Sequence, residues 1–314
     1  MKLATFDAGN GARLGLVTDD KLLDLTASGA PELMSMLALI DAGEAGLDRA
    51  QNAATTAPQY AVSDVRLLAP LPEPRQIRDA SSFPRHIANA PNGMHRLGAV
   101  LAGEPDPGFA EGEVTEVYRR QPIFYITNRF SVLGHDADVI WPGYSDYMDY
   151  ELEVAAVIGK RGRNIDRAEA FNHVFGYTIF NDFSARDTQL REMAGWLGPA
   201  KGKSFDGGNV FGPVIVTRDE IPDPHNLRTV ARINGRVVTD TSTAPILHGF
   251  DEMIAFISQD ETLHPGEIIG SGTVNDGCGL ERFEFLEDGD VVELEVEGIG
   301  ILRNRVQRSS RNKT

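Results

Sequence analysis

Two glutamates interrupt an otherwise apolar stretch of the chain, "DYELEVAAVIGK", residues 149–160. Glu151 and Glu153 are two positions apart, so their side chains share one face if the stretch is a β-strand. Burying one unpaired carboxylate is costly, and burying two neighbouring like charges is costlier. The pattern therefore requires a compensating positive charge at this face.

Carboxylates also interrupt two other apolar runs. Asp182 ends the run "YTIFND", and Asp79 follows a short strand-like run in "QIRDASS". Carboxylates that converge in a protein interior favour a divalent cation, and oxygen donors alone select a hard ion such as Mg²⁺, Mn²⁺ or Ca²⁺ over zinc. The structural alternative is that each acid pairs with an arginine or caps a turn.

The elements that must position these acids are mostly strands. From about residue 73 to 307, β-rich runs such as "VFGPVIVT" and "VVELEVEGIGILRNRV" are separated by Gly, Asp and Asn turns. Helical patterns are few, at residues 166–174, 185–195 and 250–258. Because strands and helices do not alternate regularly, the sequence predicts an α+β fold with a mixed, mostly antiparallel sheet.

The amino-terminal residues 1–70 are predicted to form a small α/β domain. Three short apolar runs with turn signals between them indicate a β-meander, and a helical pattern with proline at its start follows from Pro31. Residues 71–314 are then the second, larger domain, reached through the proline-rich stretch 67–76.

Two further segments lie outside these patterns. Residues 87–120 join two core-like segments, and a connection this long is usually functional or mobile. We interpret it as a lid over a site, with a plain surface excursion as the alternative. The basic end, residues 303–314, is expected to be a solvated, frayed tail.

Composition excludes several classes of partner. The 30 lysines and arginines against 46 aspartates and glutamates give a formal charge of −16, which argues against nucleic acid and anionic membranes as partners. Cys278 is the only cysteine, so no intrachain disulfide is possible. The start lacks a signal-peptide core, and no apolar run approaches the ~20 residues that span a bilayer. We expect a soluble cytoplasmic protein.

Six segments occur together in a characteristic order and spacing: "DYELEVAAVIGKRGR", "FGYTIFNDFSARDTQ", "GPAKGKSFD", "GPVIVTRDEI", "LHPGEIIGSGTV" and "GDVVELEVEGIGILRN". Together they resemble the fumarylacetoacetate hydrolase (FAH) superfamily, over about residues 65–307. The combination of ExE, NDxSARDxQ and GKSFD is highly specific. The resemblance implies the family's mixed β-roll in the larger domain, a small N-terminal domain and a homodimer.

The resemblance also implies roles for particular residues. It implies a metal site for a divalent cation, with Mg²⁺ first and Mn²⁺ or Ca²⁺ as alternatives. It further implies a catalytic histidine, an orienting glutamate, polar groups that hold an oxyanion and two substrate-binding side chains. The residues, in that order, are metal ligands Asp79, Glu151, Glu153 and Asp182; histidine His86; glutamate Glu281; oxyanion groups Arg186, Gln189 and Lys203; and substrate-binding Tyr125 and Thr273.

The activity implied is metal-dependent hydrolysis of a C–C bond in a 1,3-diketo acid, such as an acylpyruvate or fumarylacetoacetate. A histidine held by a glutamate takes a proton from water, and hydroxide attacks a carbonyl. The enolate leaving group is held by the metal. Cys278, near Glu281 in sequence, is interpreted as a small buried filler rather than a nucleophile.

Three alternatives remain. Oxaloacetate-type decarboxylases and enol–keto isomerases of the superfamily share the three metal carboxylates but do not need the water-activating pair, so His86 and Glu281 favour hydrolysis. A non-enzymatic metal-binding protein would be expected to lose one of the site positions. Met193 stands where the parent hydrolase has a substrate-contacting tyrosine, so a related acylpyruvate or a sugar-acid diketone fits as well as fumarylacetoacetate.

Overall fold

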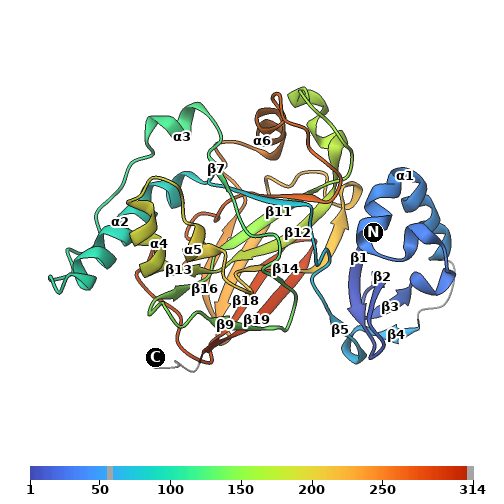
Figure 1. The fold of residues 1–314 in the computed structure, drawn as a ribbon, viewed down its shortest axis with the longest axis horizontal. Helices are drawn as coiled ribbons and strands as arrows, with labels where there is room; N and C mark the ends of the chain where they lie inside the picture. The colour runs from blue at the N-terminus through green and yellow to red at the C-terminus, as the bar shows by residue number, and fades with distance from the viewer. Residues whose placement is uncertain (55–58, 310–314) are drawn as a thin grey trace.

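Two β-sheets form the centre of the molecule, and helices lie at their edges (Figure 1). The structure is a computed structural model and describes residues 1–54 and 59–309. The α-helices are α1 (Met36–Ala53), α2 (Pro84–Leu101), α3 (Glu116–Arg120), α4 (Arg186–Met193), α5 (Ala200–Lys203) and α6 (Phe250–Ile257), and the 3₁₀ helices are η1 (Thr26–Ser28), η2 (Pro31–Leu33), η3 (Val62–Asp64), η4 (Arg167–His173) and η5 (Arg218–Glu220).

The larger sheet runs through both predicted domains. Its strands lie in the order β4 (Tyr60–Ala61), β3 (Lys21–Asp24), β2 (Ala12–Thr18), β1 (Lys2–Asp7), β14 (Asn209–Thr217), β12 (Val174–Asp182), β11 (Leu152–Ile158), β17 (Glu267–Gly270), β6 (Gln76–Ala80) and β7 (Phe124–Ile126). Two short strands branch from this path, β5 (Arg66–Leu67) beside β1 and β8 (Val132–Leu133) beside β14.

The second sheet packs against the first. Its order is β16 (Arg236–Ser242), β15 (Arg228–Ile233), β18 (Val291–Val296), β19 (Gly300–Arg308) and β9 (Asp138–Trp141), and a separate pair joins β10 (Met148–Asp149) to β13 (Ser184–Ala185). Among the strands described, only the pairs β6–β17, β8–β14 and β9–β19 are parallel. This mixed, mostly antiparallel arrangement with few helices confirms the predicted α+β class.

Strands β11 and β12 are buried along their whole lengths, which explains why their sequences are almost continuously apolar. Alternate residues of β11 belong to different cores. Val154 and Ala156 lie in the core shared with the second sheet, whereas Ala155 and Val157 lie in a core shared with β1 and α1. Glu153 points to the same side as Ala155 and Val157.

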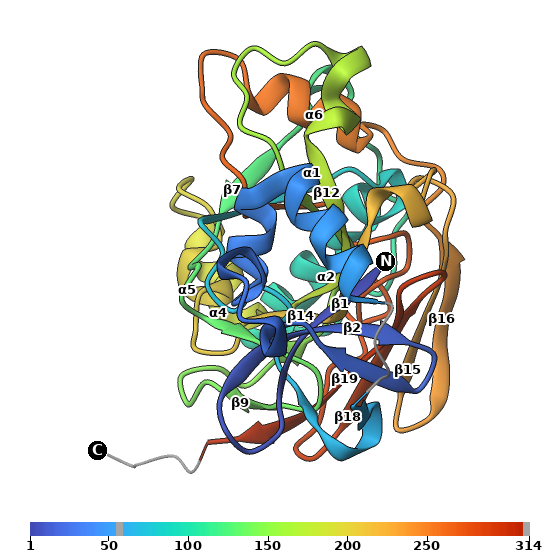
Figure 2. The ribbon, with the colours of Figure 1, turned by 90° about the vertical axis from the view of Figure 1, so that its right-hand side faces the viewer.

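The predicted amino-terminal meander is present as β1, β2 and β3. It continues the larger sheet, because Lys2 and Leu3 pair with Val216 and Ile215 of β14. Helix α1 packs on it and kinks at Gly43, whose φ is 57° (Figure 2). The division of the chain into residues 1–70 and 71–314 stays a prediction.

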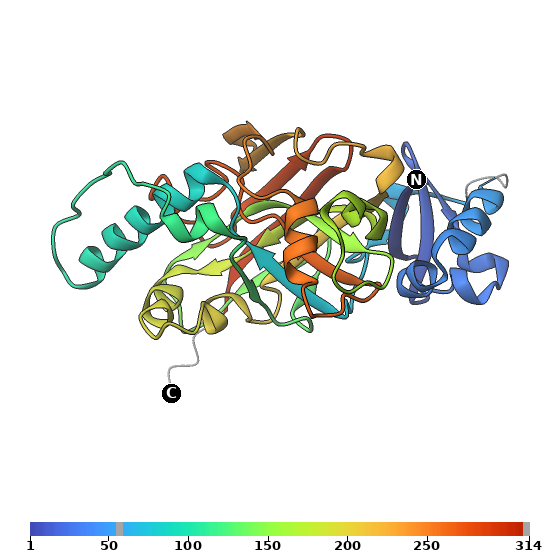
Figure 3. The same cartoon turned by 90° about the horizontal axis from the view of Figure 1, so that it is seen from above.

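The segment 87–120 is largely helical, since α2 and α3 occupy both of its ends. Helix α2 and residues 102–115 project from the end of the molecule opposite the meander (Figure 3). The role of the segment as a lid stays a prediction. The expected frayed tail is wrong for residues 303–308, which lie in β19, and residues 310–314 lie outside the described part. No helix in the described ranges is both long and apolar enough to cross a bilayer.

Candidate active site

Three carboxylates from three strands of the larger sheet meet in the interior. Asp79 of β6, Glu153 of β11 and Asp182 of β12 each offer an oxygen within 4.8 Å of the other two. Gly270 of β17 lies between β6 and β11, and a Cβ there would be 2.3 Å from Asp79 Oδ1 and 3.0 Å from Glu153 Oε2. A glycine at this position therefore leaves the space between the carboxylates open.

The donor set fits a divalent cation. Asp79 Oδ1, Glu153 Oε2 and Asp182 Oδ1 are buried and lack a hydrogen-bond partner among the described residues. Burial, together with the neighbouring carboxylates, raises the pKa of Asp79 and of Glu153 well above the ordinary range. Burial also raises the pKa of Asp182 to about 6, although Lys203 opposes the shift. A hard cation would satisfy these oxygens and remove the repulsion between them.

Glu151 has protein cations of its own. Lys203 Nζ donates to Glu151 Oε2 and, at 2.6 Å, to Asp182 Oδ2, and an Arg186 nitrogen lies 2.8 Å from Glu151 Oε1. Burial alone would raise the pKa of Glu151, but Lys203 and Arg186 outweigh it and lower that pKa to about 2. The two glutamates of the ExE stretch are thus compensated differently: Glu151 pairs with Lys203 and Arg186, whereas Glu153 forms no ion pair with any side chain in the described ranges.

Arg186, at the start of α4, uses all three of its side-chain nitrogens in hydrogen bonds. Two of its nitrogens donate to Asp149 Oδ2 at 2.7 and 2.9 Å, and a third donates to Gln189 Oε1 at 2.9 Å. Asp149 also accepts the backbone N–H groups of Gly279 and Leu280, each at 2.8 Å. Sequence reasoning missed Asp149, although this acid directly precedes the "YELE" motif.

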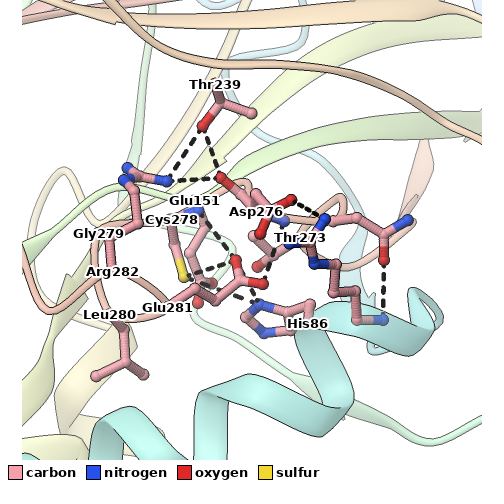
Figure 4. A network of polar contacts seen from close by, with 12 residues as sticks. His86, Glu151, Thr239, Thr273, Asp276, Cys278, Gly279, Leu280, Glu281 and Arg282 are labelled. Atoms are coloured by element: carbon pink, nitrogen blue, oxygen red, sulfur yellow. Dashed lines mark hydrogen bonds and ion pairs between the residues drawn. The ribbon is translucent and has the colours of Figure 1, made fainter. Parts of the chain in front are cut away.

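His86 and Glu281 form a pair in the part of the site that also holds Glu151 and Cys278 (Figure 4). His86 lies in the first turn of α2, and its Nδ1 is 3.3 Å from Glu281 Oε2. The carboxylate also accepts the backbone N–H groups of Asp276 at 3.2 Å and Cys278 at 3.3 Å. Burial raises the pKa of Glu281, but His86, Cys278 and the Asp276 N–H together more than offset this, so the pKa lies below its ordinary value.

Cys278 contacts both members of this pair. Its Sγ is 3.3 Å from Glu281 Oε2 and 3.8 Å from His86 Nδ1. The side chain is fully buried, and burial, reinforced by Glu281, raises the pKa of the thiol well above its usual value. The prediction of a buried cysteine is confirmed, but its contacts with the pair were not anticipated.

The remaining predicted residues contact the metal-site acids. Tyr125 OH donates to Asp182 Oδ2 at 2.5 Å, and Thr273 Oγ1 donates to Glu153 Oε1 at 3.4 Å. An isolated backbone bridge joins Glu151 to Cys278 and so links the carboxylates to the histidine pair. The structure therefore brings all the predicted catalytic, substrate-binding and metal-binding residues into one connected site, while their individual roles stay predictions. Met193 is half exposed.

Comparison with known proteins agrees with this geometry. The family model described as fumarylacetoacetate (FAA) hydrolase C-terminal matches residues 102–307, and the one described as Rv2993c-like, N-terminal matches residues 1–70. The chain is 33% identical over 314 residues to a protein of Bos taurus named oxaloacetate tautomerase FAHD2A, mitochondrial, covering 98% of this chain and 91% of that one.

Two solved structures are similar across almost the whole chain. A fumarylacetoacetate hydrolase from psychrophilic Exiguobacterium antarcticum has a TM-score of 0.77 at 30% identity, covering 98% of this chain and all of that one. Maleylpyruvate hydrolase from Sphingobium sp. SYK-6, in complex with manganese(II) and pyruvate, has a TM-score of 0.74 at 26% identity, covering 99% and 100%. The chain belongs to the fumarylacetoacetate hydrolase family, and these relatives support a metal-dependent enzyme of that family.

Proposed function

We propose that this enzyme hydrolyses a C–C bond in a 1,3-diketo acid of the acylpyruvate kind. The observation that carries the proposal is the His86–Glu281 pair, with Nδ1 3.3 Å from the carboxylate. The Glu151–Cys278 backbone bridge and Lys203, which bonds both Glu151 and Asp182, link this pair to the clustered acids. An ionised glutamate next to Nδ1 of His86 favours the imidazole tautomer whose proton is on Nδ1. Nε2 is then the basic nitrogen.

The chain's own groups account for the proton transfers. His86 Nε2 takes a proton from water, and the resulting hydroxide attacks the carbonyl distal to the carboxylate end of the substrate. Lys203 donates to Glu151 and Asp182 and has a third N–H, with which it stabilises the oxyanion that forms, a contribution of about 3 kcal/mol for a single donor. His86 then returns the proton to the carbon that leaves, which gives two acids as products.

Asp79, Glu153 and Asp182 would hold the divalent cation, with Glu151 next to them. The ion supplies positive charge that stabilises the leaving enolate. We propose Mg²⁺ as the physiological ion, because all the donors are oxygens. Mn²⁺ is the alternative, and the manganese(II) and pyruvate complex of the Sphingobium hydrolase supports both a divalent ion and a 2-oxo acid at this site.

Arg186 is better suited to positioning than to holding an oxyanion. Its nitrogens already donate to Asp149 and Gln189, and one lies 2.8 Å from Glu151. We assign it the task of fixing Glu151 and the Gln189 side chain. The substrate is a small molecule, and the cytoplasmic location and the homodimer stay predictions.

A second candidate is enol–keto tautomerisation of a 2-oxo acid. The observation in its favour is the 33% identity, over 98% of the chain, to a protein named oxaloacetate tautomerase. The same His86 would move a proton between carbon and oxygen, and no water would be activated. The two candidates therefore differ in their products rather than in their site.

Loss of the enol ultraviolet band, followed by product analysis, separates the candidates. The panel is acetylpyruvate, fumarylpyruvate, fumarylacetoacetate and oxaloacetate, each with Mg²⁺, Mn²⁺ or a chelator. Metal-dependent decay of an acylpyruvate into two acids supports the hydrolase. Interconversion of oxaloacetate tautomers without cleavage supports the tautomerase, and release of carbon dioxide identifies a decarboxylase.

Two variants test the role of His86. His86→Ala should abolish turnover, whereas His95→Ala, an exposed histidine on the same helix, should leave it unchanged. Full cleavage activity in His86→Ala would refute the mechanism.

A further inference from the structure

We propose that His86, Cys278 and Glu281 form a second metal site, for a borderline-soft divalent ion of the Zn²⁺ type. The three side chains offer an imidazole nitrogen, a sulfur and a carboxylate oxygen that lie within 4.8 Å of one another. This donor set differs in kind from the oxygen-only cluster of Asp79, Glu153 and Asp182. Nitrogen and sulfur ligands are those that zinc prefers, whereas Mg²⁺ prefers oxygen.

The distances between the donor atoms are close to those of a tetrahedral zinc site. Glu281 Oε2 is 3.3 Å from both His86 Nδ1 and Cys278 Sγ, and Sγ is 3.8 Å from Nδ1. With Zn–S of about 2.3 Å and Zn–N or Zn–O of about 2.0–2.1 Å, neighbouring ligand atoms of a tetrahedron lie about 3.3–3.6 Å apart. The site can therefore close on an ion with shifts of a few tenths of an ångström.

The backbone around the three ligands is firmly held. The turn that carries Cys278 and Glu281 is anchored by Asp149, which accepts the N–H groups of Gly279 and Leu280 at 2.8 Å. Such outer contacts orient metal ligands and raise affinity. The His86 side chain is 11% exposed to solvent and that of Glu281 is 1% exposed, so solvent reaches the site past the histidine. A water completes the coordination from that side.

Occupation of this site is incompatible with the proposed base. Coordination replaces the Cys278 S–H proton, which passes to solvent, and it requires Nδ1 of His86 to be free of its proton. The imidazole then carries its proton on Nε2, the atom that must accept one from water. The ion would therefore act as an inhibitor by fixing the opposite tautomer. This consequence rests on the proposed function, but the existence of the site does not.

Cobalt(II) is the probe that tests the site, with the full chain held in saturating Mg²⁺ to fill the carboxylate cluster. We expect a thiolate-to-cobalt charge-transfer band in the near ultraviolet, together with the visible bands of tetrahedral cobalt, and both should vanish on addition of Zn²⁺. Because the chain has a single cysteine, a thiolate band can come only from Cys278.

Variants make the assignment specific. Cys278→Ser should lose the charge-transfer band, and Glu281→Gln should keep it but bind cobalt at least 10-fold more weakly. His95→Ala and Asp79→Asn serve as controls that should retain the band at wild-type affinity. Absence of the band in the wild type at excess cobalt, or its persistence in Cys278→Ser, would overturn the proposal.

A second arm tests the inhibition separately. With saturating Mg²⁺, Zn²⁺ should inhibit the wild type, and Cys278→Ser should require at least 10-fold more zinc when each rate is normalised to its own zinc-free value. Equal zinc sensitivity, or zinc occupancy without loss of rate, would overturn the inhibition. If the enzyme turns over none of the diketo acids, the proposed function fails while the cobalt spectra still decide the site.

Discussion

Replacing Gly93 with alanine should disturb the His86–Glu281 pair from a distance. Gly93 lies two turns beyond His86 on α2 and faces Leu280, the neighbour of Glu281. A Cβ at Gly93 would lie 2.4 Å from the Leu280 carbonyl oxygen and 2.7 Å from Leu280 Cγ. The close approach of α2 to this backbone therefore depends on the missing side chain.

The size of the effect follows from the contact. Ordinary contact begins near 3.4 Å, so α2 and the Leu280 backbone must separate by about 1.0 Å. Overpacking of this kind costs about 1–3 kcal/mol of stability. The same displacement acts between the elements that carry His86 and Glu281, the proposed base and its carboxylate, and a misplacement of about 1 Å lowers turnover about 100-fold.

Gly98→Ala is the matched control on the same helix. Its Cβ would meet only Leu190 Cδ2, at 3.7 Å, so it should fit and should raise the helix stability by up to about 1 kcal/mol. The assays are the melting temperature and the initial rate on the best diketo acid, measured well below both melting temperatures, with the Mg²⁺-induced thermal shift as a check on the carboxylate cluster. A wild-type rate in Gly93→Ala would refute the reasoning.

Three further predictions concern charges. Mg²⁺ should raise the melting temperature, because it neutralises the clustered carboxylates. Asp79→Asn should raise the melting temperature of the metal-free protein but reduce the increase that Mg²⁺ causes. An unchanged increase with Mg²⁺ would contradict Asp79 as a ligand. Asp149→Ala removes one of the two carboxylates paired with buried Arg186 and the acceptor of the Gly279 and Leu280 N–H groups, and should cost about 3–5 kcal/mol in chemical denaturation; a loss below about 1 kcal/mol would contradict the ion pair's role. The pKa of Glu281 is lower in the folded protein than its ordinary value of 4.5, which applies to the unfolded chain. Its ionised form therefore stabilises the fold above pH 4.5, and this stability is lost as the pH falls through the folded-state pKa. Glu281→Gln should therefore lose less stability on acidification than the wild type, and equal acid sensitivity would count against this.

The sequence predicts that Glu151 and Glu153 need a neighbouring positive charge, but it does not predict which groups supply that charge. Strand periodicity places both on one face, which is a local property. Lys203 reaches Glu151 only because α5 packs against α4 and β13, which depends on tertiary packing. Asp79 reaches Glu153 through the intervening Gly270, whose parallel pairing with Asp79 joins residues almost 200 positions apart.

Two local errors also have physical causes. The stretch that became α2 contains Pro91 and glycines, which lower helix propensity, yet Gly93 allows the packing against Leu280 that stabilises the helix. The end of the chain was judged by its charge. In β19 the basic residues alternate with Leu302 and Val306, which are buried. The alternation of polar and apolar residues therefore predicts a strand here, whereas the positive charge does not.

The pairing of β1 with β14 has a consequence for the free molecule. Lys2 and Leu3 occupy backbone groups of Ile215 and Val216 that would otherwise form part of an open sheet edge. An open edge is a template for strand addition by another chain and so for aggregation. The chain made without the meander would keep the clustered carboxylates but would present this edge to other chains. The small amino-terminal meander therefore covers a sheet edge that could otherwise pair with the edge of another chain.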